Sequence, residues 1–199
     1  MNRTAFLLSV LSLSFMPPLI SLVYAHEAHE HGVAKINIAV DGAQVDIGME
    51  SPLANLLPFE HSPATLEQRK QVREMARRMR QADTLFQLSP RAECRLEKVA
   101  LASEKFDAAL LDPNAPLEPA QAGDNGKEPS GTGQKTGEAE HCDLDADFSF
   151  TCAKPEHLNS VDIGLFAVWP NLQKINVQAV TPQGQHAAGL TPQEHVVSW

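Results

Sequence analysis

The stretch of this sequence richest in metal-binding side chains is the hexapeptide His26-Glu27-Ala28-His29-Glu30-His31, which holds three imidazoles and two carboxylates. Zn²⁺ binds neutral imidazole nitrogens and carboxylate oxygens, usually four donors in a tetrahedron, and needs no thioether. Histidines so close in sequence can reach one ion from many backbone conformations. The hexapeptide therefore predicts a metal site with His26, His29 and His31 as ligands, against the simpler interpretation of a solvated polar tail.

A predicted β-hairpin follows the hexapeptide. Apolar and polar residues alternate over 33–40 and again over 45–49, and the turn-forming pair Asp41-Gly42 lies between the two runs. A two-residue turn at that pair places His31 opposite Pro52, where the second strand finishes. The hexapeptide should therefore lie beside the end of the second strand.

Glu60 and His61 follow the predicted hairpin after one short apolar piece, 53–59. Because the second strand ends beside the hexapeptide, this pair can fold back within reach of His29 and His31. We therefore predict one shared metal site, to which the hexapeptide histidines, Glu60 and His61 all contribute. The simpler interpretation of His61 is a polar residue that is hydrogen-bonded near a helix start.

A second, weaker metal site is predicted at His141 and Asp143, where Asp145 and Asp147 continue an acidic pattern on one face of a strand. Solvation of an edge strand explains these carboxylates equally well. The remaining histidines are isolated in the sequence and are expected to be surface residues: His157, His186 and His195.

Residues 1–25 are typical of a secretory signal, with a positive charge at Arg3, an apolar run, and a small-residue cleavage site at Val23-Tyr24-Ala25. Cleavage there makes His26 the first residue of an exported chain. The α-amine and imidazole of a terminal His26 could chelate Cu²⁺ together. A copper carrier or copper oxygenase with such an amino-terminal brace is therefore the rival function.

Three cysteines, Cys94, Cys142 and Cys152, would pass through an oxidising compartment, where thiols at a compatible distance usually pair. The number of cysteines alone leaves all three pairings possible. Cys94 and Cys152 each lie in an alternating, strand-like run, whereas Cys142 borders a segment of flexible composition. This pattern favours a bridge between Cys94 and Cys152, worth roughly 4 kcal/mol on the chain-entropy model.

One long amphipathic helix is predicted from Thr65 to about Ala82. Thr65 and Gln68 make a capping-box signature, and apolar residues recur at helical spacing at Leu66, Val72, Met75 and Met79. The opposite face is rich in arginine. We expect that face to be solvated, or to dock an acidic partner or the chain's own acidic loop.

The fold class predicted is α+β, with an antiparallel sheet in a single domain over 26–199. Strand-like runs over 94–101 and 172–180 add to the hairpin, so strands outnumber helices. Residues 112–140 have no aromatic side chain and are dense in Gly, Pro, Ser, Thr, Gln and charge. This composition predicts a long disordered central loop over about 107–140.

Charge and motifs exclude several classes of protein. The net charge of −9 leaves no basic face for the phosphate backbone of a nucleic acid. No Ser/His/Asp order, glycine-rich phosphate loop or paired CxxC motif occurs, so we expect a protein that is not an enzyme. A structural envelope protein without tight metal is the remaining alternative.

Short segments spread along most of the chain carry a further pattern, at 29–34, 51–56, 59–63, 148–152, 165–166, 177–178 and 184–185. They resemble the ZrgA-type family of periplasmic zinc-uptake proteins. The resemblance implies a soluble zinc binder of the Gram-negative periplasm that serves import across the envelope alongside energised inner-membrane proteins. It also supports the pairing of Cys94 with Cys152. Members of that family often carry a long His/Asp/Glu-rich tract in the central loop, whereas this loop holds only His141.

Overall fold

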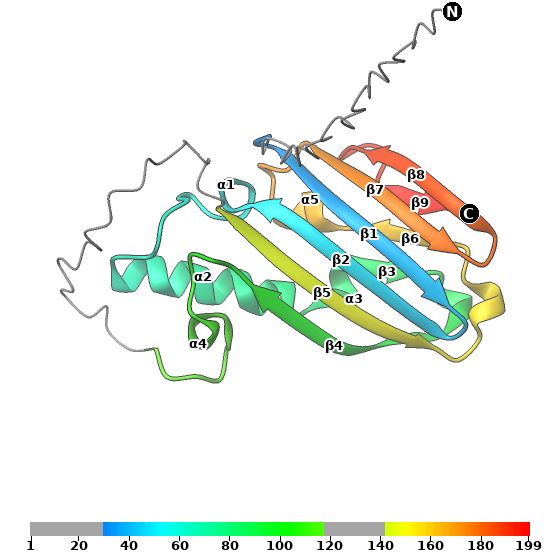
Figure 1. Cartoon of the computed structure of the whole chain (residues 1–199), viewed down its shortest axis with the longest axis horizontal. Coiled ribbons are helices and arrows are strands. Elements are labelled where there is room, and N and C mark those ends of the chain that lie inside the picture. The colour runs from blue at the N-terminus through cyan, green and yellow to red at the C-terminus, as the bar shows by residue number, and fades with distance from the viewer. Residues whose placement is uncertain (1–29, 118–141) are drawn as a thin grey trace, which may run out of the picture.

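The computed structural model describes residues 30–117 and 142–199, which form two β-sheets with helices packed on them (Figure 1). The larger sheet has six strands in the order β4-β5-β2-β1-β7-β8, and the smaller has three in the order β3-β6-β9. The strands are β1 (Val33–Asp41), β2 (Gln44–Pro52), β3 (Phe86–Leu88), β4 (Cys94–Ala102), β5 (Asp143–Cys152), β6 (Ser160–Ile163), β7 (Lys174–Thr181), β8 (Gly184–Leu190) and β9 (Val196–Ser198). The α-helices are α1 (Leu53–Leu56), α2 (Leu66–Met79), α3 (Ala82–Leu85), α4 (Ala108–Leu111) and α5 (Leu165–Val168).

The six-stranded sheet is antiparallel except for one pair of strands. β1 runs parallel to β7, with Ile36 opposite Val177, and every other neighbouring pair in this sheet is antiparallel. Parallel neighbours need a crossover connection, and here the chain forms α2 and most of the small sheet before it returns as β7. The α+β class is confirmed. The prediction of an antiparallel sheet misses the β1–β7 pair, because alternation of apolar residues carries no information about strand direction.

The β1–β2 hairpin turns at Gly42-Ala43. Asp41 pairs with Gln44, and Gly42 has a φ of 57°, which suits the first central position of a type II′ turn. The prediction placed glycine second in the turn, so the expected register, with His31 opposite Pro52, is wrong by two residues. A shift of two keeps every side chain on its face, and the start of β1 still lies near the end of β2.

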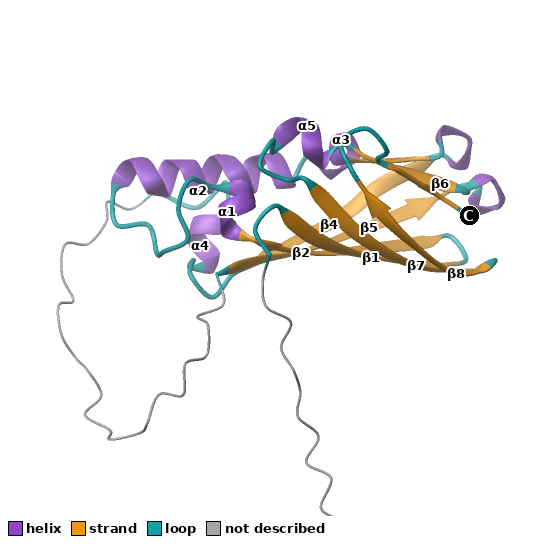
Figure 2. Cartoon of the chain, turned by 90° about the horizontal axis from the view of Figure 1, so that it is seen from above, coloured by secondary structure: helices purple, strands orange, loops and turns teal. Residues whose placement is uncertain are grey.

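One face of the large sheet forms the core. Figure 2 shows α2, α3 and α5 on one side of this sheet, and the ring centroids of Phe86 from the small sheet and Phe148 from β5 are 4.8 Å apart. The residues that alternate with the core positions are exposed, as at Asn37 and Asp46, or half-buried, as at Glu50. Buried core residues of the central strands are Ala34, Ile36, Ile38, Val45, Ile47, Met49, Leu144, Ala146, Phe148 and Phe150.

α2 starts at the predicted capping box, in which the Gln68 amide donates to the Thr65 hydroxyl and the Gln68 side chain accepts from the Thr65 amide. The helix has 14 residues and ends at Met79, before the predicted end at Ala82. Leu66 is 45% exposed, because it lies in the first turn, ahead of the buried part of the helix. None of the helices in the described ranges is long and apolar enough to cross a membrane.

The first part of the predicted disordered loop, residues 107–117, contains a helix. α4 buries Leu110, and the guanidinium of Arg73 on α2 donates to the carbonyl oxygens of Leu110 and Ala115. These hydrogen bonds hold the segment against α2. The composition of the loop does not reveal them, because the acceptors are backbone groups. Residues 118–140 of the predicted loop lie outside the described residues.

A disulfide joins Cys94 at the start of β4 to Cys152 at the end of β5, as predicted. The two residues are direct partners across these antiparallel strands. Cys142, immediately before β5, is half-buried, and its carbonyl oxygen accepts a hydrogen bond from the Leu53 amide. The bridge therefore lies at the opposite end of β5 from Cys142.

Candidate metal centre

The structure brings His31 and Glu60 together. Nε2 of His31 lies 3.2 Å from Oε1 of Glu60, and the two side chains are 68% and 38% exposed. His31 precedes β1 and Glu60 follows α1, so two segments far apart in sequence meet here, as the hairpin analysis predicted. Both donors are accessible to an ion from solvent.

A tight turn over Glu30–Val33 fixes the backbone at His31. The Val33 amide donates to the Glu30 carbonyl oxygen at 3.1 Å, and Gly32 has a φ of 84°, which suits the third residue of a type II turn. The Gly32 carbonyl oxygen accepts hydrogen bonds from the amides of Gln173 and Lys174, at 2.8 and 3.0 Å. The imidazole of His31 therefore projects from a backbone that is bonded to the start of β7.

α1 and the short segment after it position Glu60. The Leu53 amide at the start of α1 donates to the Cys142 carbonyl oxygen at 2.8 Å. The side-chain amide of Asn171 donates to the Ala54 carbonyl oxygen at 3.2 Å. These bonds attach α1 to the residue before β5 and to the loop before β7, and the chain reaches Glu60 four residues after the helix ends.

His61 does not share the contact between His31 and Glu60. Its ring stacks on Phe59 with the centroids 5.2 Å apart, and its Nδ1 lies 2.9 Å from the Ser62 carbonyl oxygen. His61 is exposed, and the contacts of its ring among the described residues are these two local ones.

The described residues supply two of the predicted donors, His31 and Glu60. His26 and His29 lie outside the described residues. In the described ranges, no three His, Cys, Asp or Glu side chains are grouped closely enough to hold a metal ion. Two ligands about 2.0 Å from Zn²⁺ at a tetrahedral angle are about 3.3 Å apart. The 3.2 Å separation of Nε2 and Oε1 therefore matches the distance between two ligands of one ion.

Three of the short segments that carry the family resemblance, 29–34, 51–56 and 59–63, converge at this pair. The Gly32 amide donates to Asn55, and His31 contacts Glu60, so residues from three separate segments form one structure. A family model described as ZrgA family zinc uptake protein matches residues 28–199. The chain belongs to the ZrgA family. A search of the curated proteins finds no match.

In this ZrgA family chain, the second predicted metal site is a group of carboxylates. Asp143 begins β5, and His141 lies outside the described residues. Burial raises the pKa of Asp145, and the charges of its neighbours raise it further, namely Glu50, Asp143, Asp147 and Glu104. Within the described ranges this group forms no recognisable metal site.

His195 is paired with a carboxylate, although the sequence predicted an isolated surface residue. Its Nδ1 lies 2.6 Å from Oδ1 of Asp162, and each side chain is 39% exposed. The Ile163 amide also donates to the His195 carbonyl oxygen at 3.0 Å. The two contacts fasten the segment before β9 to β6. Asp162 is distant in sequence, so no local pattern could have indicated this pair.

His157 and His186 are half-buried rather than exposed. His157 lies 3.8 Å from the carboxylate of Glu156, and the ring of His186 lies 6.5 Å from that of Trp199. Neither histidine is near the His31–Glu60 pair by any contact that the structure records.

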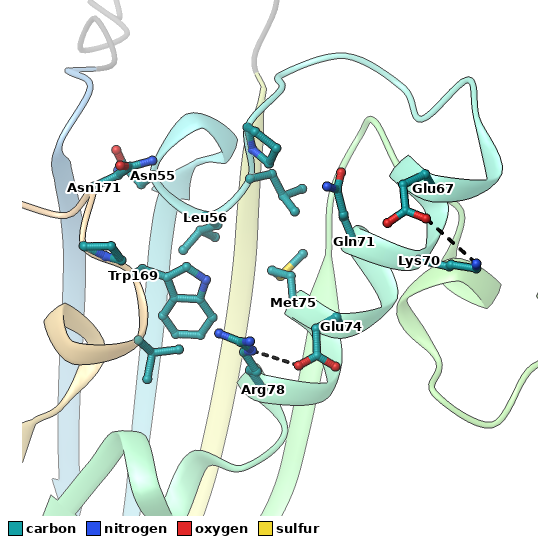
Figure 3. Close-up of a pocket in the computed structure, with 14 residues that line it drawn as sticks. Asn55, Leu56, Glu67, Lys70, Gln71, Glu74, Met75, Arg78, Trp169 and Asn171 are labelled. Atoms are coloured by element: carbon teal, nitrogen blue, oxygen red, sulfur yellow. Dashed lines mark hydrogen bonds and ion pairs between the residues drawn. The ribbon is translucent and has the colours of Figure 1, made fainter.

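A groove of about 490 Å³ between α1, α2 and the residues after α5 was not predicted from the sequence. Figure 3 shows Trp169 projecting into it, opposite the α2 side chains that include Glu74. Arg77 and Arg78 donate hydrogen bonds to Glu74 and lower its pKa to about 2. Asn55 lines this groove and also accepts the hydrogen bond from the Gly32 amide. The groove therefore adjoins the structure that carries His31.

Proposed function

We propose that this chain is a non-enzymatic Zn²⁺-binding protein of the Gram-negative periplasm, where it takes part in zinc uptake. The observation that carries the proposal is the His31–Glu60 pair, two metal donors 3.2 Å apart that come from separate segments. Membership of a family of zinc uptake proteins supports zinc as the cargo. The proposed ligands are His26, His29, His31, Glu60 and His61.

Two donors leave a tetrahedral zinc ion two ligands short. His29 lies two residues before His31, and His26 three residues earlier, so the chain is long enough to bring either imidazole to the ion. His61 directly follows Glu60. A rotation of its exposed ring away from Phe59 could add a ligand at the cost of one stacking contact.

The exposure of the proposed site suits transfer of the ion to another protein. The His31 side chain is 68% exposed, so the ligands of an acceptor can approach a bound ion without unfolding of the carrier. The net charge of −9 favours the approach of a cation. The proposed partners are the energised inner-membrane proteins of zinc import.

The test is metal analysis of the protein purified from the periplasm without a histidine tag, with the mass of its amino terminus measured on the same sample. We expect stoichiometric zinc and a chain that begins at His26. Copper binds most nitrogen sites more tightly than zinc in vitro, so the metal carried in the cell decides between them. Copper in place of zinc, or no metal after exposure to zinc, would contradict the proposal.

A further inference from the structure

Asn55 is a buried polar residue of α1, with 2% of its surface exposed. Its side chain makes three hydrogen bonds. Oδ1 accepts from the Gly32 amide at 2.7 Å, and Nδ2 donates to the Val33 carbonyl oxygen at 2.9 Å and to the Ser51 hydroxyl at 3.1 Å. Because an unsatisfied buried amide costs about 1–3 kcal/mol, these bonds strongly favour one position of α1 relative to Gly32 and Val33.

Asn55 lies between the two donors of the proposed site. Gly32 and Val33 immediately follow His31, and two of the three hydrogen bonds of Asn55 go to these residues. On the other side, α1 continues through a short segment to Glu60. A movement of α1 away from the turn would therefore change the distance between His31 and Glu60.

The other hydrogen bonds of the turn and of α1 do not connect the two to each other. Gln173 and Lys174 hold the Gly32 carbonyl oxygen, but they attach the turn to β7, not to α1. Asn171 holds α1 through the Ala54 carbonyl oxygen, but it makes no hydrogen bond to the turn. Among the α1 side chains that the structure describes, only that of Asn55 is hydrogen-bonded to the turn that carries His31.

We propose that Asn55 is a positioning residue for zinc, which holds His31 at chelating distance from Glu60 without touching the ion. This inference rests on the proposed function, because it takes His31 and Glu60 as zinc ligands. Residues that orient metal ligands commonly change metal affinity by 10–100-fold when they are replaced. A preformed pair also loses less conformational freedom when the ion binds.

The main test compares Asn55→Ala with Asn171→Ala in a zinc titration against a competing chelator. Asn55→Ala removes all three hydrogen bonds, and its zinc affinity should fall about 10-fold or more. Asn171→Ala is the matched comparison, since it removes one side-chain bond to the same helix but leaves the turn and the bond between Leu53 and Cys142 intact. Its zinc affinity should therefore fall by much less than that of Asn55→Ala. Asn55→Asp keeps an acceptor for the Gly32 amide, so its zinc affinity should lie between those of Asn55→Ala and Asn171→Ala.

Two further readouts separate positioning from a general loss of structure. In the metal-free protein, hydrogen exchange at the Gly32 amide should accelerate in Asn55→Ala and stay slow in Asn171→Ala. In a His31→Ala background, Asn55→Ala should cause no further loss of zinc affinity, because Asn55 acts through His31.

Unchanged zinc affinity in Asn55→Ala, together with faster exchange at Gly32, would overturn the positioning role and leave the proposed function intact. An additive loss in the His31→Ala background would overturn it as well. Failure of the parent protein to bind zinc would overturn both proposals. If Asn55→Ala does not fold, Asn55→Asp carries the same comparison with Asn171→Ala.

Discussion

Two of the histidines that the structure describes contact a carboxylate from a distant part of the sequence, and the two pairs differ in what surrounds them. His31 and Glu60 lie 3.2 Å apart with side chains 68% and 38% exposed. His195 and Asp162 lie 2.6 Å apart, each 39% exposed, and a backbone hydrogen bond beside them joins the same two segments. The first pair lies within two residues of His29 and of His61 in sequence, whereas the histidine nearest to the second pair in sequence is His157, five residues before Asp162.

We propose that the two pairs have different roles, because contact between a histidine and a carboxylate does not by itself indicate a metal ligand. The Asp162 contact and the nearby backbone bond give His195 a structural role, which needs no ion. His31 projects from a turn that is hydrogen-bonded to the start of β7 and to Asn55 of α1, and the proposed function adds His29 and His61 as further ligands. The following experiments test whether the two pairs really have different roles.

The largest effect should be the stabilisation of the fold by zinc. At a free zinc concentration 100 times the Kd, the ion should stabilise the parent protein by about 2.7 kcal/mol. Glu60→Gln should lose most of this gain, and Asp162→Asn should keep it. Chemical denaturation with and without zinc measures the difference. An equal gain in both variants would show that the pairs do not differ in metal binding.

Gly32→Ala should cost about 1–2 kcal/mol in the metal-free protein and also weaken zinc binding, because a side chain strains the left-handed backbone. Gly32 has a φ of 84°, and an added Cβ would lie 3.3 Å from the Gln173 side chain. Gly42→Ala is the control, with a φ of 57° and no atom within 4 Å. Both should lower stability in a denaturation experiment, but only Gly32→Ala should lower zinc affinity. Loss of affinity in Gly42→Ala would contradict the account.

His195→Ala should destabilise the metal-free protein by about 1 kcal/mol, since it removes a hydrogen bond to a carboxylate. His31→Ala should change the metal-free stability by less than about 0.5 kcal/mol, because its ring is exposed. Urea denaturation in the presence of a chelator checks both values. The reverse order would mean that His31, not His195, has the structural role.

The smallest effect is expected at Asp145, which has several other carboxylates as neighbours. Burial and the neighbouring charges raise its pKa, so its contribution to stability is present at low pH and is lost as the pH rises through the raised value. Asp145→Asn should therefore stabilise the protein slightly at neutral pH, and the gain should vanish below about pH 3. Denaturation at several pH values measures it, and a variant less stable than the parent at neutral pH would contradict the sign.

Local patterns in the sequence predicted the features that depend on local physics. The Thr65 capping box, the alternation in β1 and β2, and the pairing of Cys94 with Cys152 are confirmed. The meeting of His31 with Glu60 was predicted although the hairpin register was wrong by two residues. A two-residue shift moves the strand ends only slightly, and the same faces remain buried.

Other features depend on contacts between distant segments, which no local pattern indicates. The parallel β1–β7 pair and the small sheet depend on the path that the chain takes between distant strands. The Asp162 partner of His195 lies in β6, far from His195 in sequence. Asn55 lies within one of the segments that carry the family resemblance, but a single Asn in an apolar piece carries no sign of its three hydrogen bonds.

The most direct test of the account is a zinc titration against a competing chelator at neutral pH. The parent protein is compared with His31→Ala, His61→Ala and His195→Ala. We expect His31→Ala and His61→Ala to weaken zinc binding by similar factors of about 10 or more, and His195→Ala to bind like the parent. If His31→Ala binds zinc as tightly as the parent, the His31–Glu60 pair is not the centre of the site. Parent-like affinity in His61→Ala alone would restrict the site to Glu60 and the amino-terminal histidines.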